Sequence, residues 1–236
     1  MSRLRLVFFA CVSVLLAGFW PTDALAGSLA QEAQQQVQAL LDQSQDTEKT
    51  FQAAMVARWE AFKSWLDLSA DRQATAKLAV QELCRSLNDA DTANRSNSLL
   101  MLAFLAGSQP EEVVASSYEA EIFSELVTAI ECDDCPPYSA KENASYVLLV
   151  LANKLPISDL RVRFTQRVMD ILVKEIQRGY SRCACNGMKI LQKLGLRLPE
   201  DSLQVFFRPS VMAVLSLSWH HESQFGQDCI SVAHIL

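Results

Sequence analysis

Glycine and proline are scarce in this sequence, with seven of each among 236 residues. This scarcity excludes a collagen-like chain and a protein built mainly of glycine-rich turns. Charged residues make up only 20% of the chain and hydrophobic residues 50%, which excludes an intrinsically disordered protein. A chain of this length buries roughly 70% of its extended surface on folding. The composition therefore predicts a globular helical protein, rich in leucine and alanine, with a substantial core.

Recognisable catalytic motifs are also missing. The sequence has no Gly-x-Ser-x-Gly elbow, no His-Glu-x-x-His pair and no glycine-rich phosphate loop. The acidic pairs Glu111-Glu112 and Asp133-Asp134 fit solvated helix starts and loops better than general acid–base pairs. His220 and His221 are adjacent, and adjacent residues on a helix point about 100° apart, so they are poorly placed to bind one metal ion. We therefore expect no enzymatic activity and no cofactor.

The first 26 residues have the pattern of a secretory signal peptide. Arg3 and Arg5 precede an apolar run, Leu6–Trp20, which Pro21 ends, and Ala24-Leu25-Ala26 supplies small residues for cleavage. As a helix the run would rise only about 23 Å, less than the hydrocarbon core of about 30 Å. We therefore predict a cleaved signal peptide over residues 1–26, with an uncleaved membrane anchor as the alternative.

Cleavage of the signal peptide would change the net charge and the number of cysteines. Cleavage would remove two arginines, one aspartate and Cys11, and would change the formal net charge from −6 to −7. An acidic protein repels phosphate backbones, so we expect no nucleic-acid partner. The other apolar runs, residues 99–106 and 146–152, are too short to cross a bilayer, so no membrane span is expected after cleavage. The predicted location is periplasmic or secreted.

Residues 27–68 form a glutamine-rich, polar segment with apolar residues at helical spacing. The main stripe follows steps of four, four, three and four residues: Phe51, Met55, Trp59, Phe62 and Leu66. This pattern predicts a helix that faces the core or caps it, and the alternative is a helix that binds a partner.

From Ser69, a residue type that often precedes a helix, residues 69–236 show weak self-similarity. Four segments pair a small first residue with a following apolar run, and their starts are 47, 42 and 42 residues apart: Ser98, Ser145, Gly187 and Cys229. Each follows another helical segment: residues 75–87, 121–131, 164–178 and 210–219. Prolines mark the turns between these segments. The predicted repeat is therefore a pair of helices.

A helix pair that repeats every 40 to 47 residues resembles HEAT and armadillo repeats. The resemblance concerns architecture only, over residues 69–236, and implies an all-α fold of stacked helix pairs, an α-solenoid, with the glutamine-rich helices at its N-terminal end. One helix pair cannot bury its apolar stripe alone, so neighbouring pairs stack. An irregular helical bundle is the alternative.

Six cysteines remain after cleavage, and an even number in an oxidising compartment favours disulfide bonds. Each lies near the joint between the two helices of its predicted pair, and equivalent joints of stacked repeats are neighbours. The four joints hold one, two, two and one cysteine: Cys84, then Cys132 and Cys135, then Cys183 and Cys185, then Cys229.

This distribution predicts three disulfides between successive repeats. Cys84 pairs with Cys132 or Cys135, the remaining member pairs with Cys183 or Cys185, and the last cysteine pairs with Cys229. Each bond would restrict the unfolded chain and so raise the free energy of unfolding by on the order of 4 kcal/mol.

Two other interpretations of the cysteines remain open. In the first, Cys132, Cys135, Cys183 and Cys185 bind zinc or another soft metal, although Cys-x-Cys is tighter than the usual zinc knuckle. In the second, Cys132 and Cys135 form a redox pair, although the strand context of such motifs is missing.

Helical stacks commonly bind other proteins on an extended surface. The sequence therefore favours an exported, non-catalytic helical-repeat protein that binds a protein partner as an adaptor or assembly component in the cell envelope. The alternative is an exported metal-binding protein that uses the four central cysteines, and an enzyme with an unrecognised site comes third.

Overall fold

The computed structural model describes residues 22–42, 51–88, 92–131, 139–179, 181–209 and 211–213. In these residues the chain forms helices and no strand. The elements are α2 (Thr22–Leu41), α3 (Phe51–Leu68), α4 (Arg72–Arg85), η1 (Ser86–Asn88), α5 (Thr92–Ser108), α6 (Glu111–Ser117), α7 (Ala120–Glu131), α8 (Ser139–Lys154), α9 (Ile157–Arg163), α10 (Gln166–Arg178), α11 (Arg182–Arg197) and α12 (Glu200–Phe206).

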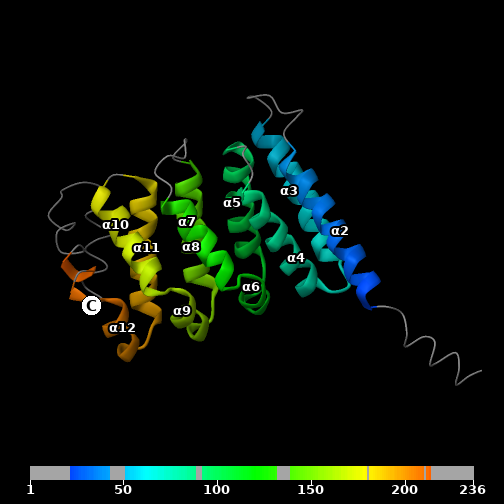
Figure 1. The fold of residues 1–236 in the computed structure, drawn as a ribbon. Coiled ribbons are helices and arrows are strands. Elements are labelled where there is room, and N and C mark those ends of the chain that lie inside the picture. The colour runs from blue at the N-terminus through cyan, green and yellow to red at the C-terminus, as the bar shows by residue number, and fades with distance from the viewer. Residues whose placement is uncertain are drawn as a thin grey trace, which may run out of the picture.

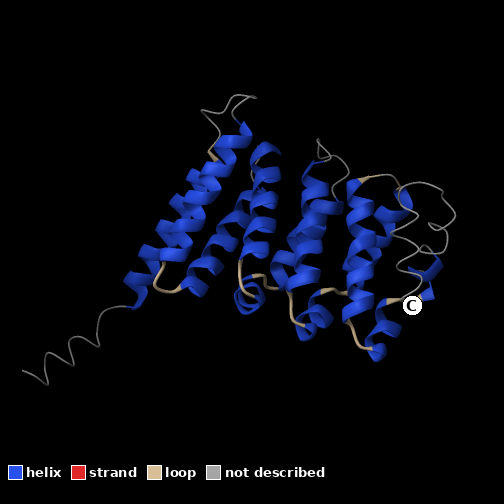
Figure 2. Ribbon diagram, turned by 180° about the vertical axis from the view of Figure 1, so that it is seen from behind, coloured by secondary structure: helices blue, strands red, loops and turns tan. Residues whose placement is uncertain are grey.

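The helices stack in a row from the N-terminal to the C-terminal end (Figure 1). Helices α5, α8 and α11 lie side by side, and each packs against the long helix that precedes it, α4, α7 or α10. The C-terminal ends of α4, α7 and α10 and the N-terminal ends of α5, α8 and α11 lie along one edge of the stack (Figure 2). The short helices α6, α9 and α12 lie along the opposite edge (Figure 2). The predicted all-α, solenoid-like fold is confirmed.

The repeating unit contains three helices and not two. The prolines after each second helix were predicted to mark turns, but Pro110, Pro156 and Pro199 are each the N-cap residue of a seven-residue helix. Proline suits this position because its φ is already near the helical value and it has no backbone N–H to leave unpaired. Two helical turns are too few to give a clear apolar period, which is why the pattern alone did not show them.

Some predicted segments lie outside the described residues. Residues 1–21 are not described, and α2 continues through the predicted cleavage point after Ala26. Of the predicted fourth helix pair, residues 210–219 and 229–236, only residues 211–213 are described, and these are helical. The signal peptide and the fourth pair therefore stay predictions.

The N-terminal pair α2 and α3 packs on α4 and shares its core. Phe62 and Leu66 of the predicted stripe are buried, and Met55 and Trp59 pack partly buried against the same cluster. The indole nitrogen of Trp65 donates a hydrogen bond to Glu32 at 2.8 Å, which joins α3 to α2. The core-facing interpretation of this stripe therefore holds for the four described side chains.

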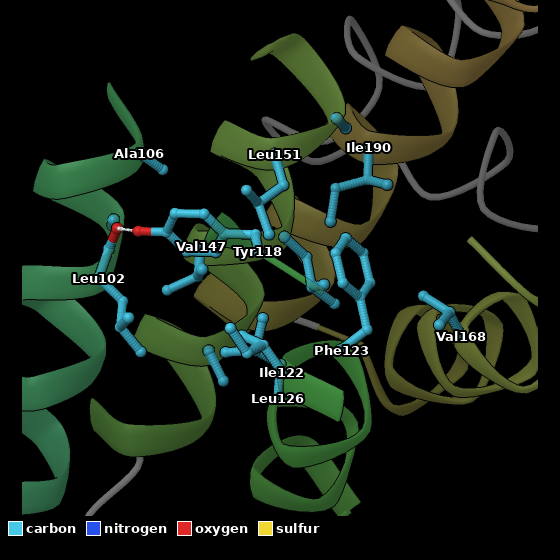
Figure 3. Packing of buried hydrophobic residues seen from close by; sticks show 14 of the residues in the cluster. Leu102, Ala106, Tyr118, Ile122, Phe123, Leu126, Val147, Leu151, Val168 and Ile190 are labelled. Carbon is cyan, nitrogen blue, oxygen red and sulfur yellow. Dashed lines mark hydrogen bonds between the residues drawn. The ribbon is translucent and has the colours of Figure 1, made fainter. Parts of the chain in front are cut away.

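Successive repeats share buried side chains. The ring of Tyr118 is fully buried between α5 and α8, and its hydroxyl donates to the carbonyl of Leu102 at 2.5 Å (Figure 3). Burial raises the pKa of Tyr118 well above its ordinary value. Phe123 of α7 meets Phe164 edge to face, with ring centroids 5.4 Å apart. These contacts make the core continuous along the stack.

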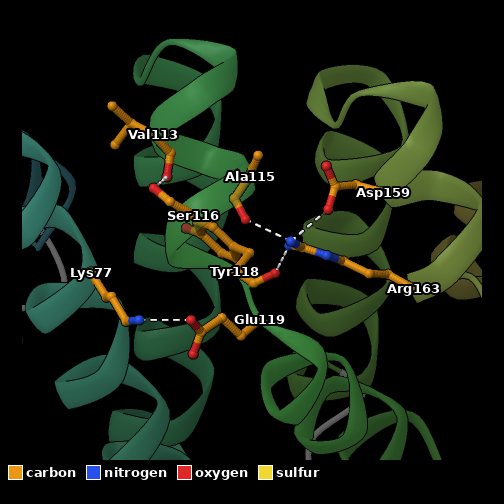
Figure 4. Close-up of polar contacts among 8 residues, drawn as sticks. All are labelled: Lys77, Val113, Ala115, Ser116, Tyr118, Glu119, Asp159 and Arg163. Atoms are coloured by element: carbon orange, nitrogen blue, oxygen red, sulfur yellow. Dashed lines mark hydrogen bonds and ion pairs between the residues drawn. The ribbon is translucent and has the colours of Figure 1, made fainter.

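An arginine of the next repeat donates hydrogen bonds to backbone carbonyls at the C-terminal end of α6. Arg163 at the end of α9 donates to the carbonyls of Ala115, at 2.6 Å, and Tyr118, and it pairs with Asp159 at 2.7 Å (Figure 4). A cation here complements the negative end of the helix dipole. Arg163 therefore joins α9 to the C-terminal end of α6, one repeat earlier.

Candidate protein-binding face

The first turns of α8 and α11 make equivalent hydrogen bonds to the preceding repeat. The amide of Asn143 in α8 donates to the carbonyl of Ser96 in α5 at 3.0 Å. The amide of Asn186 in α11 donates to the carbonyl of Glu142 in α8 at 3.3 Å and to the hydroxyl of Ser145 at 2.9 Å. The same side-chain type therefore performs the same bridging role in two successive repeats.

The last turns of the same helices repeat this arrangement with cations. Lys154 at the end of α8 donates to the carbonyl of Gln109 after α5 at 3.3 Å. Arg197 at the end of α11 donates to the carbonyl of Leu155 after α8 at 2.7 Å and to that of Ala152 at 2.6 Å. Each cation satisfies carbonyls at the C-terminal end of the neighbouring helix, which lack partners within that helix.

These hydrogen bonds set the register of the repeat. Gln109 and Leu155 are 46 residues apart, and Lys154 and Arg197 are 43 residues apart. The predicted spacing of 47 and 42 residues differs because it aligns Ser98 with Ser145, two small residues before apolar runs. The structure instead places Ser98 in the same buried position as Ala144 and Gly187.

In this register one row of positions on each helix is at least partly exposed. The row follows helical spacing, three and then four residues apart, and two of its members, Leu100 and Val150, also pack against the core. Its members are Asn97, Leu100 and Phe104 in α5; Asn143, Tyr146 and Val150 in α8; and Asn186, Lys189 and Lys193 in α11. We call this set of residues the row face.

The row face is apolar and aromatic in its first two repeats. The side chain of Tyr146 is 40% exposed and that of Phe104 is 36% exposed. Phe104 also meets the ring of Trp59 in α3, with centroids 5.7 Å apart, which extends the aromatic surface toward the N-terminal pair. Large aromatic side chains that remain in solvent are typical of binding surfaces.

Basic residues are concentrated in the helices that carry the row face. Together α5, α8 and α11 contain seven basic residues and a single acidic one, Glu142, in a chain whose net charge is −6. Several of these cations have partners within the protein: Lys141 pairs with Glu175 at 3.2 Å, and Arg182 lies 4.0 Å from Glu142. No ion pair with any described residue is formed by Lys189 or Lys193.

The described cysteines lie at one edge of the stack, where the long helices are joined. Cys84 is in the last turn of α4, and Cys183 and Cys185 are in the first turn of α11 (Figure 1). Cys132, Cys135 and Cys229 lie outside the described residues. Every predicted disulfide includes at least one of these three, so the pairing stays a prediction.

The thiol of Cys183 is buried and that of Cys84 is partly buried. Burial, with a smaller contribution from the Glu125 carboxylate, raises the pKa of the Cys84 thiol to about 12. Burial likewise raises the pKa of Cys183 to about 11, against the opposing effect of a hydrogen bond with Ser145. Neither side chain has the lowered pKa typical of a reactive cysteine.

The metal-binding hypothesis meets a geometric difficulty at α11. Cys183 and Cys185 are two positions apart on a regular helix, so their side chains point about 160° apart. Both could bind one ion only if this turn unwound. The structure shows no metal-binding group of three or more acidic, cysteine or histidine side chains within its described ranges. Because Cys132 and Cys135 lie outside those ranges, the hypothesis as a whole stays untested.

Other candidates can be placed only in part. His220, His221 and His234 lie outside the described residues. A pocket of about 310 Å³ lies between α9, α10 and α12, where Arg161 pairs with Asp201 at 3.3 Å. Its described lining contains no histidine, cysteine or lysine, and the hydroxyl of Ser202 donates to the Asp201 carboxylate at 3.2 Å. Among the helices in the described part of the chain, none is long and apolar enough to cross a membrane.

The row face was not among the sites predicted from the sequence. Tyr146 was read as the start of an apolar run, and Lys189 and Lys193 as part of another. An alignment of the repeats by 46 and 43 residues would have placed Asn97, Asn143 and Asn186 in one column. That identity of residue type was the available signal.

Comparison with solved structures shows several designed proteins of the same architecture. A protein computationally designed with armadillo repeats for modular peptide recognition has a TM-score of 0.61 and 15% identity, over 86% of this chain and 99% of its own. A designed armadillo repeat protein in complex with the peptide (KR)4 has a TM-score of 0.59 and 14% identity, over 92% of this chain and 95% of its own.

No protein-family model and no curated protein matches the sequence. At these identities the structural likeness establishes the fold and not a family. The predicted HEAT or armadillo resemblance is confirmed at the level of architecture, and the chain has an armadillo-like helical-repeat fold.

Proposed function

We propose that this chain is an exported, non-catalytic helical-repeat protein that binds a segment of another protein, as an adaptor or assembly component in the cell envelope. The observation that carries the proposal is the row face itself, where Phe104 and Tyr146 expose aromatic surface and two lysines of α11 form no ion pair with a described residue. Enclosed polar clusters suit catalysis, whereas an open, extended surface of this kind suits a peptide.

The designed armadillo proteins support this proposal. One was made for modular peptide recognition and another was solved with a bound peptide. In a helical stack, equivalent positions of successive repeats form one continuous surface. The row face has this form, with Leu100, Tyr146 and Lys189 at equivalent positions.

The exported location rests on the N-terminal sequence. Arg3, Arg5 and the apolar run Leu6–Trp20 support a signal peptide. Expression of the full chain with a C-terminal tag in a bacterium should yield a secreted or periplasmic product, and N-terminal sequencing should begin at Gly27. A product that keeps residues 1–26 and stays in the cytoplasm would contradict this part of the proposal.

The binding function is tested by selection of peptides from a random twelve-residue display library on the full chain. Enriched peptides should lose at least about tenfold in affinity when Tyr146→Ala is introduced, which is about 1.4 kcal/mol of binding free energy. The control is Val162→Ala, because Val162 is also exposed but lies on α9 at the edge of the stack.

Two results would contradict the binding proposal. The first is a library with no enriched peptide. The second is a set of peptides that bind the wild-type chain and the Tyr146→Ala variant equally well. Circular dichroism of both variants checks that each remains folded.

A further inference from the structure

We propose that the row face selects a protein segment with acidic residues at one end and apolar residues at the other. Lys189 and Lys193 of α11 bind the acidic side chains, and Tyr146 and Phe104 contact the apolar ones. This inference rests on the proposed protein-binding function and specifies the chemistry of the partner.

The row face changes from apolar to positively charged along the stack. The position that holds Leu100 in α5 and Tyr146 in α8 holds Lys189 in α11. The register that makes these positions equivalent comes from the hydrogen bonds at both ends of the helices. A partner that crosses the three helices therefore meets apolar surface first and positive charge last.

Lys189 and Lys193 form no ion pair with another described residue, so their charges can bind a partner. Three other cations of α8 and α11 have internal partners, since Lys154 and Arg197 donate to backbone carbonyls and Lys141 pairs with Glu175. Lys189 is exposed and Lys193 is half-buried, and four residues apart on a helix they face the same side. No acidic residue occurs anywhere in α11 to neutralise them.

The distance between packed helices sets the spacing of the partner's residues. Packed helices lie about 10 Å apart, and an extended chain rises about 3.3 Å per residue. A segment that crosses α8 and α11 would therefore place its acidic side chains about three residues from the apolar side chain that contacts Tyr146. An apolar side chain on Phe104 would lie about three residues further away.

A nucleic acid is the other polyanion that a basic surface could attract. Only Lys189 and Lys193 carry charge on the row face, and the whole chain has a net charge of −6. Nucleic-acid binding depends on neutralising many phosphates at once. Aromatic surface beside two lysines matches a mixed apolar and acidic peptide better.

The experiment is a selection from the same random twelve-residue library on three full-length proteins: wild type, Lys189→Glu and Lys174→Glu. The control reverses one charge at an exposed lysine of α10, in the other layer of the stack. Wild type and Lys174→Glu should enrich aspartate and glutamate near one end of the peptides, and Lys189→Glu should lose this enrichment and favour lysine or arginine.

Binding measurements complete the test. The best wild-type peptide should lose about tenfold or more in affinity on Lys189→Glu, and a similar amount when its acidic residues become amides. Its affinity should fall as salt rises, because salt screens exposed charges. A DNA oligonucleotide of the same length should bind more weakly than the peptide.

The possible failures are distinguishable. Peptides that depend on Tyr146 but show no acidic preference, or that respond equally to Lys189→Glu and Lys174→Glu, would overturn the acidic-partner inference and leave the binding function standing. Tighter binding of the oligonucleotide would also overturn it. The absence of any enriched peptide would reject the binding function, and this inference with it.

Discussion

Burial between repeats raises the pKa values of several single residues in this protein. Cys84 and Cys183 lie where helices of adjacent repeats meet, and both thiols have raised pKa values because water is excluded. The hydroxyl of Tyr118 is buried in the same way, but it is satisfied by the carbonyl of Leu102. These residues therefore report on the integrity of the stack, and the exposed residues Tyr146 and Lys189 report on binding.

The reduced protein should become less stable at alkaline pH because of Cys84. Its thiol has a pKa of about 12 in the folded state, against an ordinary value of 9.0. The unfolded state therefore loses this proton first as pH rises. Ionisation of this thiol therefore leaves the free energy of unfolding unchanged below about pH 9 and lowers it between pH 9 and 12. Urea unfolding of the wild type and Cys84→Ala at pH 7 to 10.5 should show a smaller decline in the variant, and equal slopes would contradict the assignment.

Arg197 should stabilise the contact between α11 and α8 in a way that lysine only partly replaces. Its guanidinium donates to the carbonyls of Ala152 and Leu155, whereas Lys154 makes one such bond at the equivalent position. We expect Arg197→Met to lower the free energy of unfolding by about 1.5 to 3 kcal/mol, and Arg197→Lys to lower it by roughly half as much. Thermal or urea unfolding measures this, and equal losses in the two variants would refute the two-bond account.

At the scale of elements, the long helices pack through small residues at one shared position. Ser98, Ala144 and Gly187 occupy it in α5, α8 and α11, and all three are buried. A Cβ added at Gly187 would lie 3.2 Å from Cγ1 of Ile176 in α10. The close approach of α10 and α11 therefore depends on the missing side chain.

Two glycine substitutions should separate helix propensity from this packing. Gly107→Ala in α5 would meet nothing closer than Val150 at 4.0 Å, so it should stabilise the protein by about 0.5 to 1 kcal/mol. Gly187→Ala gains the same propensity but crowds Ile176, so we expect no gain or a net loss. Urea unfolding of both variants provides the measurement, and an equal gain at the two positions would show that Ile176 yields without cost.

At the scale of the whole molecule, each repeat contacts mainly its neighbours. Hydrogen bonds and ion pairs between residues 40 to 48 apart join successive repeats, including Arg163 to Ala115 and Lys77 to Glu119. Stability in such a stack is the sum of the repeats and their interfaces, so the ends are the first to open. Cross-links along one edge would therefore stabilise the ends most.

Non-reducing peptide mapping tests the predicted disulfides on protein recovered from an oxidising compartment, the periplasm or the medium. We expect Cys84 linked to Cys132 or Cys135, the remaining member linked to Cys183 or Cys185, and the last cysteine linked to Cys229. Reduction should increase hydrogen exchange first in the terminal helices. Free thiols at these positions in that protein, or a Cys84–Cys229 bond, would contradict the predicted pairing.

The sequence alone was sufficient to predict the helical class, the approximate repeat length and the location of Cys84 and Cys183 at the joints. It was sufficient because apolar periodicity and the positions of prolines can be read from short stretches of the chain, without knowledge of distant contacts. The short helices were missed because seven residues carry little periodicity. The row face was missed because an exposed tyrosine and a buried one look alike in an apolar run.

Local pattern determined which segments of this protein are helical, since helix formation depends on residues three and four positions apart. Only the tertiary structure decided the register of 46 and 43 residues, because Asn143, Lys154 and Arg197 bond across repeats. That register in turn decided which side chains share one surface and brought Lys189 into line with Tyr146. Contacts between distant residues set this alignment, and a sequence pattern does not contain them.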